Sequence, residues 1–154
     1  MSTSALEREV GGLEYLQRIV AGGIAGVPIG QTLGFRLVEA GAGRVVLAGT
    51  PDARSYNLIG TVHGGWAASI LDTAMALATL ATLDAAHDFT TLDIKINYLR
   101  PLAPGTEVRA EGRVLHGGRR IVLGEARLAD PAGKLLAHGT GTCLVVARDG
   151  KAAR

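Results

Sequence analysis

The segment YNLIGTVHGGWAASILDTAMALAT, residues 56–79, decides how the rest of the chain is interpreted. It opens with polar and turn-forming residues and then becomes a long run of small and apolar ones. From Gly64 to about Leu80 the residues favour a helix, and because this helix is apolar on almost every side, other structure should enclose it. Asp72 lies in the middle of the run. Burying an ionised carboxylate is costly unless it is paired or used, so Asp72 is the first candidate for a functional group.

The bulk composition excludes several classes of protein. The 154 residues suit one domain, and 47% hydrophobic with 19% charged residues is typical of a globular chain. A net charge of +2 and 4% aromatic residues do not indicate a nucleic-acid partner. Cys143 is the single cysteine, the first residues show no signal-peptide pattern, and no stretch has the roughly 18 to 20 apolar residues of a membrane span. We therefore expect a cytoplasmic protein with neither a membrane nor a nucleic-acid partner.

The sequence on both sides of the helix predicts strands. Short turns join most of them, which indicates an antiparallel sheet. The predicted strands cover residues 35–40 and 44–50 before the helix and 90–99, 106–116, 119–129 and 134–147 after it. Within 90–99 the alternation places Thr91, Asp93, Lys95 and Asn97 on one face and Leu92, Ile94, Ile96 and Tyr98 on the other. We expect an α+β fold in which an antiparallel sheet of about six strands wraps around the central helix.

The chain divides into three parts. Residues 1–29 should hold a short amphipathic helix, at about 13–22, and turn material around Pro28. Residues 30–148 should form the sheet and its helix. The polar residues 149–154 should form a loose tail.

This plan and its motif resemble a known family. The pattern N-x-x-G-x-x-H-G-G at Asn57–Gly65, followed by L-D-T-A at Leu71–Ala74, resembles the phenylacetate-degradation type of hot-dog acyl-CoA thioesterases, within the 4-hydroxybenzoyl-CoA thioesterase-like superfamily. The segments TTLDIKINYLRP and HGGRR resemble later strands of the same family, so the resemblance covers residues 30–147. It implies a hot-dog fold and a thioester hydrolase that needs no separate cofactor, since coenzyme A enters as part of the acyl-CoA substrate. It also implies a homodimer, alone or as a dimer of dimers, with active sites between subunits.

The start of the helix is suited to thioester chemistry. Hydrolysis needs an attacking group and donors aimed at the carbonyl oxygen, which becomes negative. A helix N-terminus offers unpaired N–H groups and the positive end of the helix dipole. Gly64 and Gly65 lie there without a Cβ to keep a substrate away. We assign the carbonyl contact to the Gly64 N–H, with the Gly65 N–H as second choice.

The resemblance implies that Asp72 either attacks the thioester directly or acts as general base, and the sequence leaves both routes open. Relatives with Glu in its place often carry Ser or Thr one turn later, which helps to place water. Here that position is Ala76. The water-positioning role is therefore unassigned, which slightly favours direct attack.

The distance between the donor and the carboxylate predicts a dimer. Gly64 and Asp72 are eight residues apart on one helix, which is about 12 Å. Both groups must lie within roughly 3–4 Å of the same carbonyl. One helix cannot supply both groups, but two antiparallel copies can. The chemistry therefore predicts a two-fold homodimer with two composite sites.

Three further residues near the motif have two interpretations each. Asn57 either donates to the carbonyl oxygen or orients water as a catalytic residue, or it is a turn residue. His63 is expected to fix the loop by a hydrogen bond, with substrate contact as the alternative. Trp66 either walls the acyl pocket or fills the core. Gly65, Trp66 and Tyr98 are our further candidates for contacts with the substrate.

Coenzyme A carries phosphate groups, which need cations. The resemblance places two segments around the nucleotide, and their arginines are candidates as a group: Arg100, Arg119 and Arg120. No metal site is expected, because His63, His87, His116, His138 and Cys143 show no ligand spacing.

Two rival functions remain for comparison. A hot-dog enoyl-CoA hydratase or dehydratase needs an acid–base pair at the alpha and beta carbons, whereas His63 and Asp72 would lie about 13 Å apart along a helix. A non-hydrolytic acyl-CoA-binding hot-dog protein would bind without releasing thiol. The acyl group itself is left open between small aryl and medium-chain groups.

Overall fold

The computed structural model describes residues 8–148. Six strands form one antiparallel sheet in the order β1-β2-β4-β5-β6-β3, which confirms the expected α+β architecture. The strands are β1 (Phe35–Gly41), β2 (Arg44–Gly49), β3 (His87–Tyr98), β4 (Val108–Gly117), β5 (Ile121–Ala129) and β6 (Leu135–Ala147). β1 and β3 are the two edge strands.

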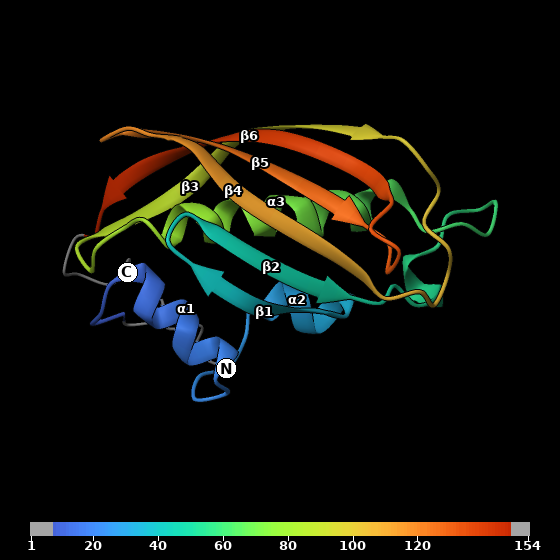
Figure 1. The fold of residues 1–154 in the computed structure, drawn as a ribbon, viewed down its shortest axis with the longest axis horizontal. Coiled ribbons are helices and arrows are strands. Elements are labelled where there is room, and N and C mark those ends of the chain that lie inside the picture. The colour runs from blue at the N-terminus through green and yellow to red at the C-terminus, as the bar shows by residue number, and fades with distance from the viewer. Residues whose placement is uncertain (1–7, 149–154) are drawn as a thin grey trace.

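The helix α3 (Gly64–Leu80) has the predicted bounds and lies inside the curve of the sheet (Figure 1). Its side chains Ile70, Leu71 and Ala74 are fully buried against the inner face of the sheet. The contact between helix and sheet is close where Gly112 of β4 passes α3, because a Cβ there would lie 2.2 Å from the Ala74 carbonyl oxygen. The apolar character of the α3 segment is thus explained by enclosure on most sides.

The N-terminal part of the described chain contributes to the same core. α1 (Gly12–Val20) confirms the short amphipathic helix, and its Tyr15 and Leu16 side chains are buried in the core. The prediction of turn material around Pro28 is wrong, because Pro28 begins a short helix, α2 (Pro28–Leu33). Proline suits this first position, where its missing N–H would be unpaired in any case. The boundary drawn between residues 29 and 30 therefore falls inside α2.

A one-turn 3-10 helix, η1 (Ala53–Ser55), precedes the loop that leads into α3. The tail predicted at 149–154 lies outside the described residues. No helix within residues 8–148 is long and apolar enough to cross a membrane.

In strand β3, the side chain of Thr91 points to the opposite face of the sheet from the one predicted. The pairing with β6 shifts by one residue between Thr91 and Asp93, so Leu92 is an extra residue in the strand. Thr91 consequently points toward α3, on the same face as Ile96 and Tyr98, and the strict alternation predicted for Thr91 is wrong. The strand also begins at His87, three residues before the predicted start.

Candidate active site

The loop before α3 is organised by Asn57. Its Oδ1 accepts hydrogen bonds from the N–H groups of Ile59 and Thr61, both at 3.1 Å, and its Nδ2 donates to Thr61 Oγ1 at 2.8 Å. Asn57 therefore has the turn role that was one of its two interpretations. Its side-chain amide carries a second hydrogen, and its contact with substrate stays a prediction.

The first turn of α3 leaves one donor free. His63 precedes the helix, and its Nδ1 accepts the Gly65 N–H at 2.8 Å, which is the loop-fixing bond expected for it. The His63 carbonyl accepts the Trp66 N–H at 3.0 Å. The Gly64 N–H, in contrast, has no acceptor among residues 8–148. Of the two glycines, Gly64 is thus the one with a donor available at the positive end of the helix.

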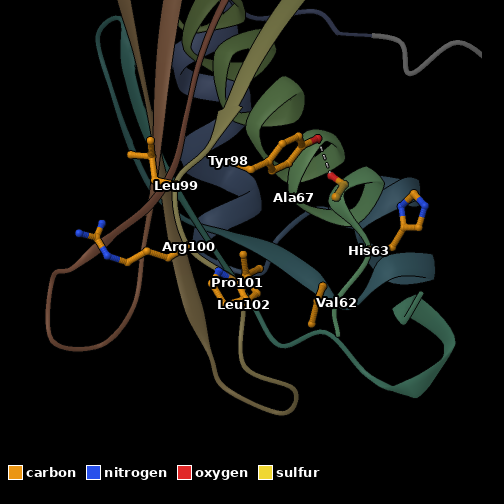
Figure 2. Close-up of a pocket in the computed structure, with 9 residues that line it drawn as sticks. Val62, His63, Ala67, Tyr98, Leu99, Arg100, Pro101 and Leu102 are labelled. Carbon is orange, nitrogen blue, oxygen red and sulfur yellow. Dashed lines mark hydrogen bonds between the residues drawn. The ribbon is translucent and has the colours of Figure 1, made fainter. Parts of the chain in front are cut away.

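A groove of about 410 Å³ opens beside this donor (Figure 2). Its lining comes from the loop before α3, from the first turn of α3 and from the segment after β3. The lining residues are Val62, His63, Gly64, Ala67, Tyr98, Leu99, Arg100, Pro101 and Leu102. The sequence did not point to Val62, Ala67 or Leu102, because three segments far apart in the chain meet here only in the fold. The groove gives an apolar ligand group a place next to the free N–H.

Tyr98 and Arg100 behave differently in this groove. The Tyr98 ring points toward α3, and its hydroxyl donates to the Gly64 carbonyl oxygen at 2.9 Å (Figure 2). The Arg100 side chain points away from His63, and its Nη1 donates to the Leu135 carbonyl oxygen at 2.6 Å. Both residues line the groove, but the Arg100 guanidinium faces the β5–β6 turn. Their contact with a substrate stays a prediction.

Trp66 is mainly a core residue. Its side chain is 3% exposed, its Nε1 donates to the Leu33 carbonyl oxygen at 2.7 Å, and its ring packs edge-on against Phe35. These contacts fix α3 to the end of α2. Trp66 also lines a second hollow of about 330 Å³, on the other side of His63, together with Tyr56 and Ser69.

Asp72 is a half-buried carboxylate without a cationic partner. No ion pair involves it among residues 8–148. Burial raises its pKa above the usual value, and a hydrogen bond of 3.1 Å from Thr91 Oγ1 to Oδ1 acts in the opposite direction. One carboxylate oxygen is therefore held by a hydroxyl, while Oδ2 has no hydrogen-bond partner in the described part of the chain.

Thr91 is the site residue that the sequence missed. Strict alternation placed it on the face away from Ile96, and only the extra residue Leu92 turns it toward Asp72. The sequence carries no clear signal for this bulge, because the β-branched and apolar residues around it fit a regular strand equally well.

Asp72 lies on the least buried side of α3. The neighbouring positions on that side carry small side chains and are only partly buried or exposed: Gly65, Ala68, Ser69 and Ala76. The free N–H of Gly64 is eight residues away on the same helix, which is about 12 Å along the helix axis. One chain therefore does not bring the two groups together.

The predicted phosphate-binding arginines lie at opposite ends of the sheet. The Arg100 N–H bonds the carbonyl of Leu136, whereas Ile121, next to Arg119 and Arg120, pairs with Leu144. Leu136 and Leu144 are eight residues apart on β6, which is about 26 Å at roughly 3.3 Å per residue. Figure 1 shows the β4–β5 hairpin at the end of the sheet opposite the start of α3. Arg100 thus belongs to the Gly64 end, and the hairpin arginines, which form no ion pair among residues 8–148, belong to the other.

No group of three or more His, Cys, Asp or Glu side chains within residues 8–148 is placed to hold a metal ion.

Comparison with known proteins gives consistent matches. Residues 59–137 match the model of the thioesterase superfamily. Human acyl-coenzyme A thioesterase 13 is 32% identical over 107 residues, which are 69% of this chain and 76% of the relative. The matched region contains the free N–H of Gly64, the carboxylate of Asp72 and the whole of β3.

Solved structures agree in fold. The phenylacetic acid degradation protein PaaI from Thermus thermophilus, solved as a mutant, has a TM-score of 0.71 and 30% identity over 77% of this chain and 98% of its own. The protein smu.793 from Streptococcus mutans, solved bound to acetyl CoA, has a TM-score of 0.69 and 26% identity over 74% of this chain and 90% of its own. The predicted hot-dog fold and thioester-hydrolase class are confirmed: this chain belongs to the thioesterase superfamily.

Proposed function

We propose that the chain is an acyl-CoA thioesterase that works as a two-fold dimer on small aryl or medium-chain acyl-CoA. The observation that carries the proposal is a pair of groups on α3: the N–H of Gly64, which has no acceptor among residues 8–148, and the carboxylate of Asp72, which has no cationic partner there. The apolar groove beside Gly64 suits an acyl group of that size. The human relative is named for acyl-coenzyme A, the Streptococcus neighbour was solved with acetyl CoA, and the Thermus neighbour is named for phenylacetic acid degradation.

The reaction uses the two groups from different protomers. The Gly64 N–H of one protomer donates to the thioester oxygen and stabilises the negative charge that develops there. The carboxylate of Asp72 in the other protomer either attacks the carbonyl carbon, with water later cleaving the anhydride, or takes a proton from a water that attacks instead. In both routes the carbon–sulfur bond breaks, the sulfur leaves with the electron pair and is protonated, and the net products are the free acid and the thiol.

Thr91 supports either route. Its hydroxyl holds Oδ1 of Asp72 and leaves Oδ2 for the substrate or for water. Desolvation keeps the carboxylate more basic than in water, which helps an attacking oxygen or a general base. The Thr91 hydroxyl donates its hydrogen to Asp72 and keeps lone pairs that can accept a hydrogen bond from an attacking water, a role for which Ala76 has no polar group.

A single two-fold axis serves both the helix and the strand. Tyr98 contacts Gly64 and Thr91 contacts Asp72, so β3 and α3 run side by side in opposite directions. The midpoint of Gly64 and Asp72 is Ala68, and the midpoint of Thr91 and Tyr98 lies between Ile94 and Lys95. An axis through both midpoints pairs β3 with its own copy and sets each Gly64 against the Asp72 of the other chain.

The free edge of β3 supports this assembly. The strand is twelve residues long, and its outer edge pairs with nothing among residues 8–148. Leu92 and Ile94 are 54% and 40% exposed. A long, exposed and partly apolar edge strand readily pairs with another chain. Pairing of β3 with its two-fold copy uses this edge and extends the sheet across the dimer.

The same axis brings the arginines together. Within one chain the β4–β5 hairpin lies at the level of Asp72, because Ile121 pairs with Leu144, next to the partner of Thr91. In the dimer the hairpin of one protomer therefore approaches the Gly64 and Arg100 end of the other. We place the nucleotide of coenzyme A near Arg119 and Arg120 of the protomer that supplies Asp72.

The function is tested by thiol release from a panel of acyl-CoA substrates. Asp72→Asn should lower kcat by about 10²-fold or more, because it removes the nucleophile or base. Glu107→Gln, an exposed carboxylate 3.8 Å from Arg36, is the matched control and should keep normal turnover. Near-normal turnover by folded Asp72→Asn protein rejects the role of Asp72. A wild-type protein that binds acyl-CoA but releases no thiol is a non-hydrolytic binder.

The ionised carboxylate of Asp72 should lower the stability of the folded protein at neutral pH. Since burial raises its pKa above the unfolded value of about 3.9, the penalty is absent below the unfolded pKa and grows as pH rises through the folded pKa. Asp72→Asn should therefore raise the melting temperature at pH 7, and the gain should shrink toward zero below about pH 4. Thermal melts of both proteins over this range measure it. A variant less stable than wild type at pH 7 would show that the native state stabilises the charged carboxylate.

Replacing Arg119 and Arg120 together by Ala should raise KM for acyl-CoA by about tenfold or more, because charge-assisted bonds to phosphate are lost. KM for the same acyl group on N-acetylcysteamine, which lacks the nucleotide, should stay unchanged. The double variant Arg36→Ala, Arg109→Ala, at exposed positions on β1 and β4, is the control. Equal effects on both substrates would move the hairpin out of the nucleotide site.

A further inference from the structure

The start of α3 needs restraint to act as a charge-stabilising donor. Gly64 and Gly65 are its first two residues, and glycine loses more conformational freedom on folding than any other residue. A donor aimed at a developing oxyanion is effective only when it is held in place before the reaction. Two consecutive glycines at a helix end supply no such rigidity themselves, so other residues must provide it.

Two side chains restrain these glycines from outside the helix. His63 accepts the Gly65 N–H, which fixes the nitrogen end of the peptide between Gly64 and Gly65. Tyr98 donates its hydroxyl to the Gly64 carbonyl oxygen at 2.9 Å, which fixes the orientation of the peptide between Gly64 and Gly65. The Tyr98 ring also closes over Gly64, because a Cβ built there would lie 3.0 Å from Cζ and 3.2 Å from the hydroxyl oxygen. Figure 2 shows the ring reaching from the end of β3 to the first turn of α3.

The backbone around Tyr98 is held in place by hydrogen bonds to β6. Its backbone pairs with Ala137 of β6, and the following N–H groups of Leu99 and Arg100 both bond the Leu136 carbonyl, at 2.8 and 3.1 Å. Core packing does not account for the side chain, which is 53% exposed. Tyr98 thus connects a strand that is held in the sheet to the first carbonyl of α3, and this bond can restrain the start of the helix.

We propose that Tyr98 is a positioning residue for the Gly64 donor. Its hydroxyl holds the peptide between Gly64 and Gly65, and its ring lies against Gly64. Gly64 is thereby kept in one backbone conformation, so that its own N–H, which belongs to the preceding peptide and has no acceptor among residues 8–148, stays beside the groove. The inference rests on the proposed function, in which this N–H binds the thioester oxygen. In this role Tyr98 affects catalysis through Gly64. A residue that only lined the groove would affect it through direct contact with the substrate.

The test is Tyr98→Phe, which removes the hydroxyl and keeps the ring. We expect kcat for acyl-CoA to fall about 5- to 20-fold, less than the roughly 10²- to 10³-fold loss of an entire oxyanion donor. KM and the affinity for a non-hydrolysable thioether analogue should stay within about twofold, because the analogue develops no oxyanion. Tyr15→Phe is the control: its hydroxyl is buried on α1 without a partner among the described residues, and kcat should not change.

A second readout does not require activity. The ¹⁵N order parameters of Gly64 and Gly65 should fall in Tyr98→Phe and remain at the wild-type value in Tyr15→Phe, because a lost restraint increases fast backbone motion. Unchanged order parameters overturn the inference even if the wild-type protein cleaves no thioester. A normal kcat in Tyr98→Phe, or a raised KM with normal kcat, also overturns it and leaves the proposed thioesterase function standing.

Discussion

The rigid spacing of two groups along one helix is the constraint on which the proposed site of this protein depends. Within the described residues, α3 holds an N–H without an acceptor at its first position and, eight residues later, a carboxylate without a cationic partner. A helix rises about 1.5 Å per residue and does not bend to close that gap. A single carbonyl cannot meet both groups of one chain. The proposed dimer, in which a second α3 lies alongside the first, accounts for the exposed edge of β3 and for the small side chains beside Asp72.

The enclosure of α3 explains how the carboxylate is tolerated. The helix buries most of its surface against the sheet and leaves one side, with Gly65, Ala68, Ser69 and Ala76, less buried around Asp72. Asp72 is desolvated enough for its pKa to rise, yet the Thr91 hydroxyl gives one of its oxygens a partner. That bond depends on the extra residue Leu92, since a regular strand would turn Thr91 away from the helix. A local irregularity in an edge strand thus gives the proposed catalytic carboxylate its hydrogen-bond partner.

The main elements could be predicted because their signals are local. The bounds of α3 follow from a run of helix-favouring residues that starts after His63, and the strands follow from alternation broken by Gly and Pro. The family could be assigned because the motif residues and Asp72 stand at fixed spacing. Pro28 was misread because proline marks a turn as readily as the first residue of a helix. The Thr91 and Tyr98 bonds and the groove depend on segments that meet only after folding, so no spacing in the sequence encodes them.

The most direct test of the shared site mixes two inactive proteins. Asp72→Asn lacks the carboxylate, and Gly64→Pro lacks the donor, and each must first be shown to fold and dimerise. In a mixed dimer one site carries both lesions and the other carries neither. With random subunit exchange, activity should return to about a quarter of wild type, because half the dimers are mixed and each has one intact site of two. Activity that stays at background while mass measurement shows heterodimers would contradict the shared site.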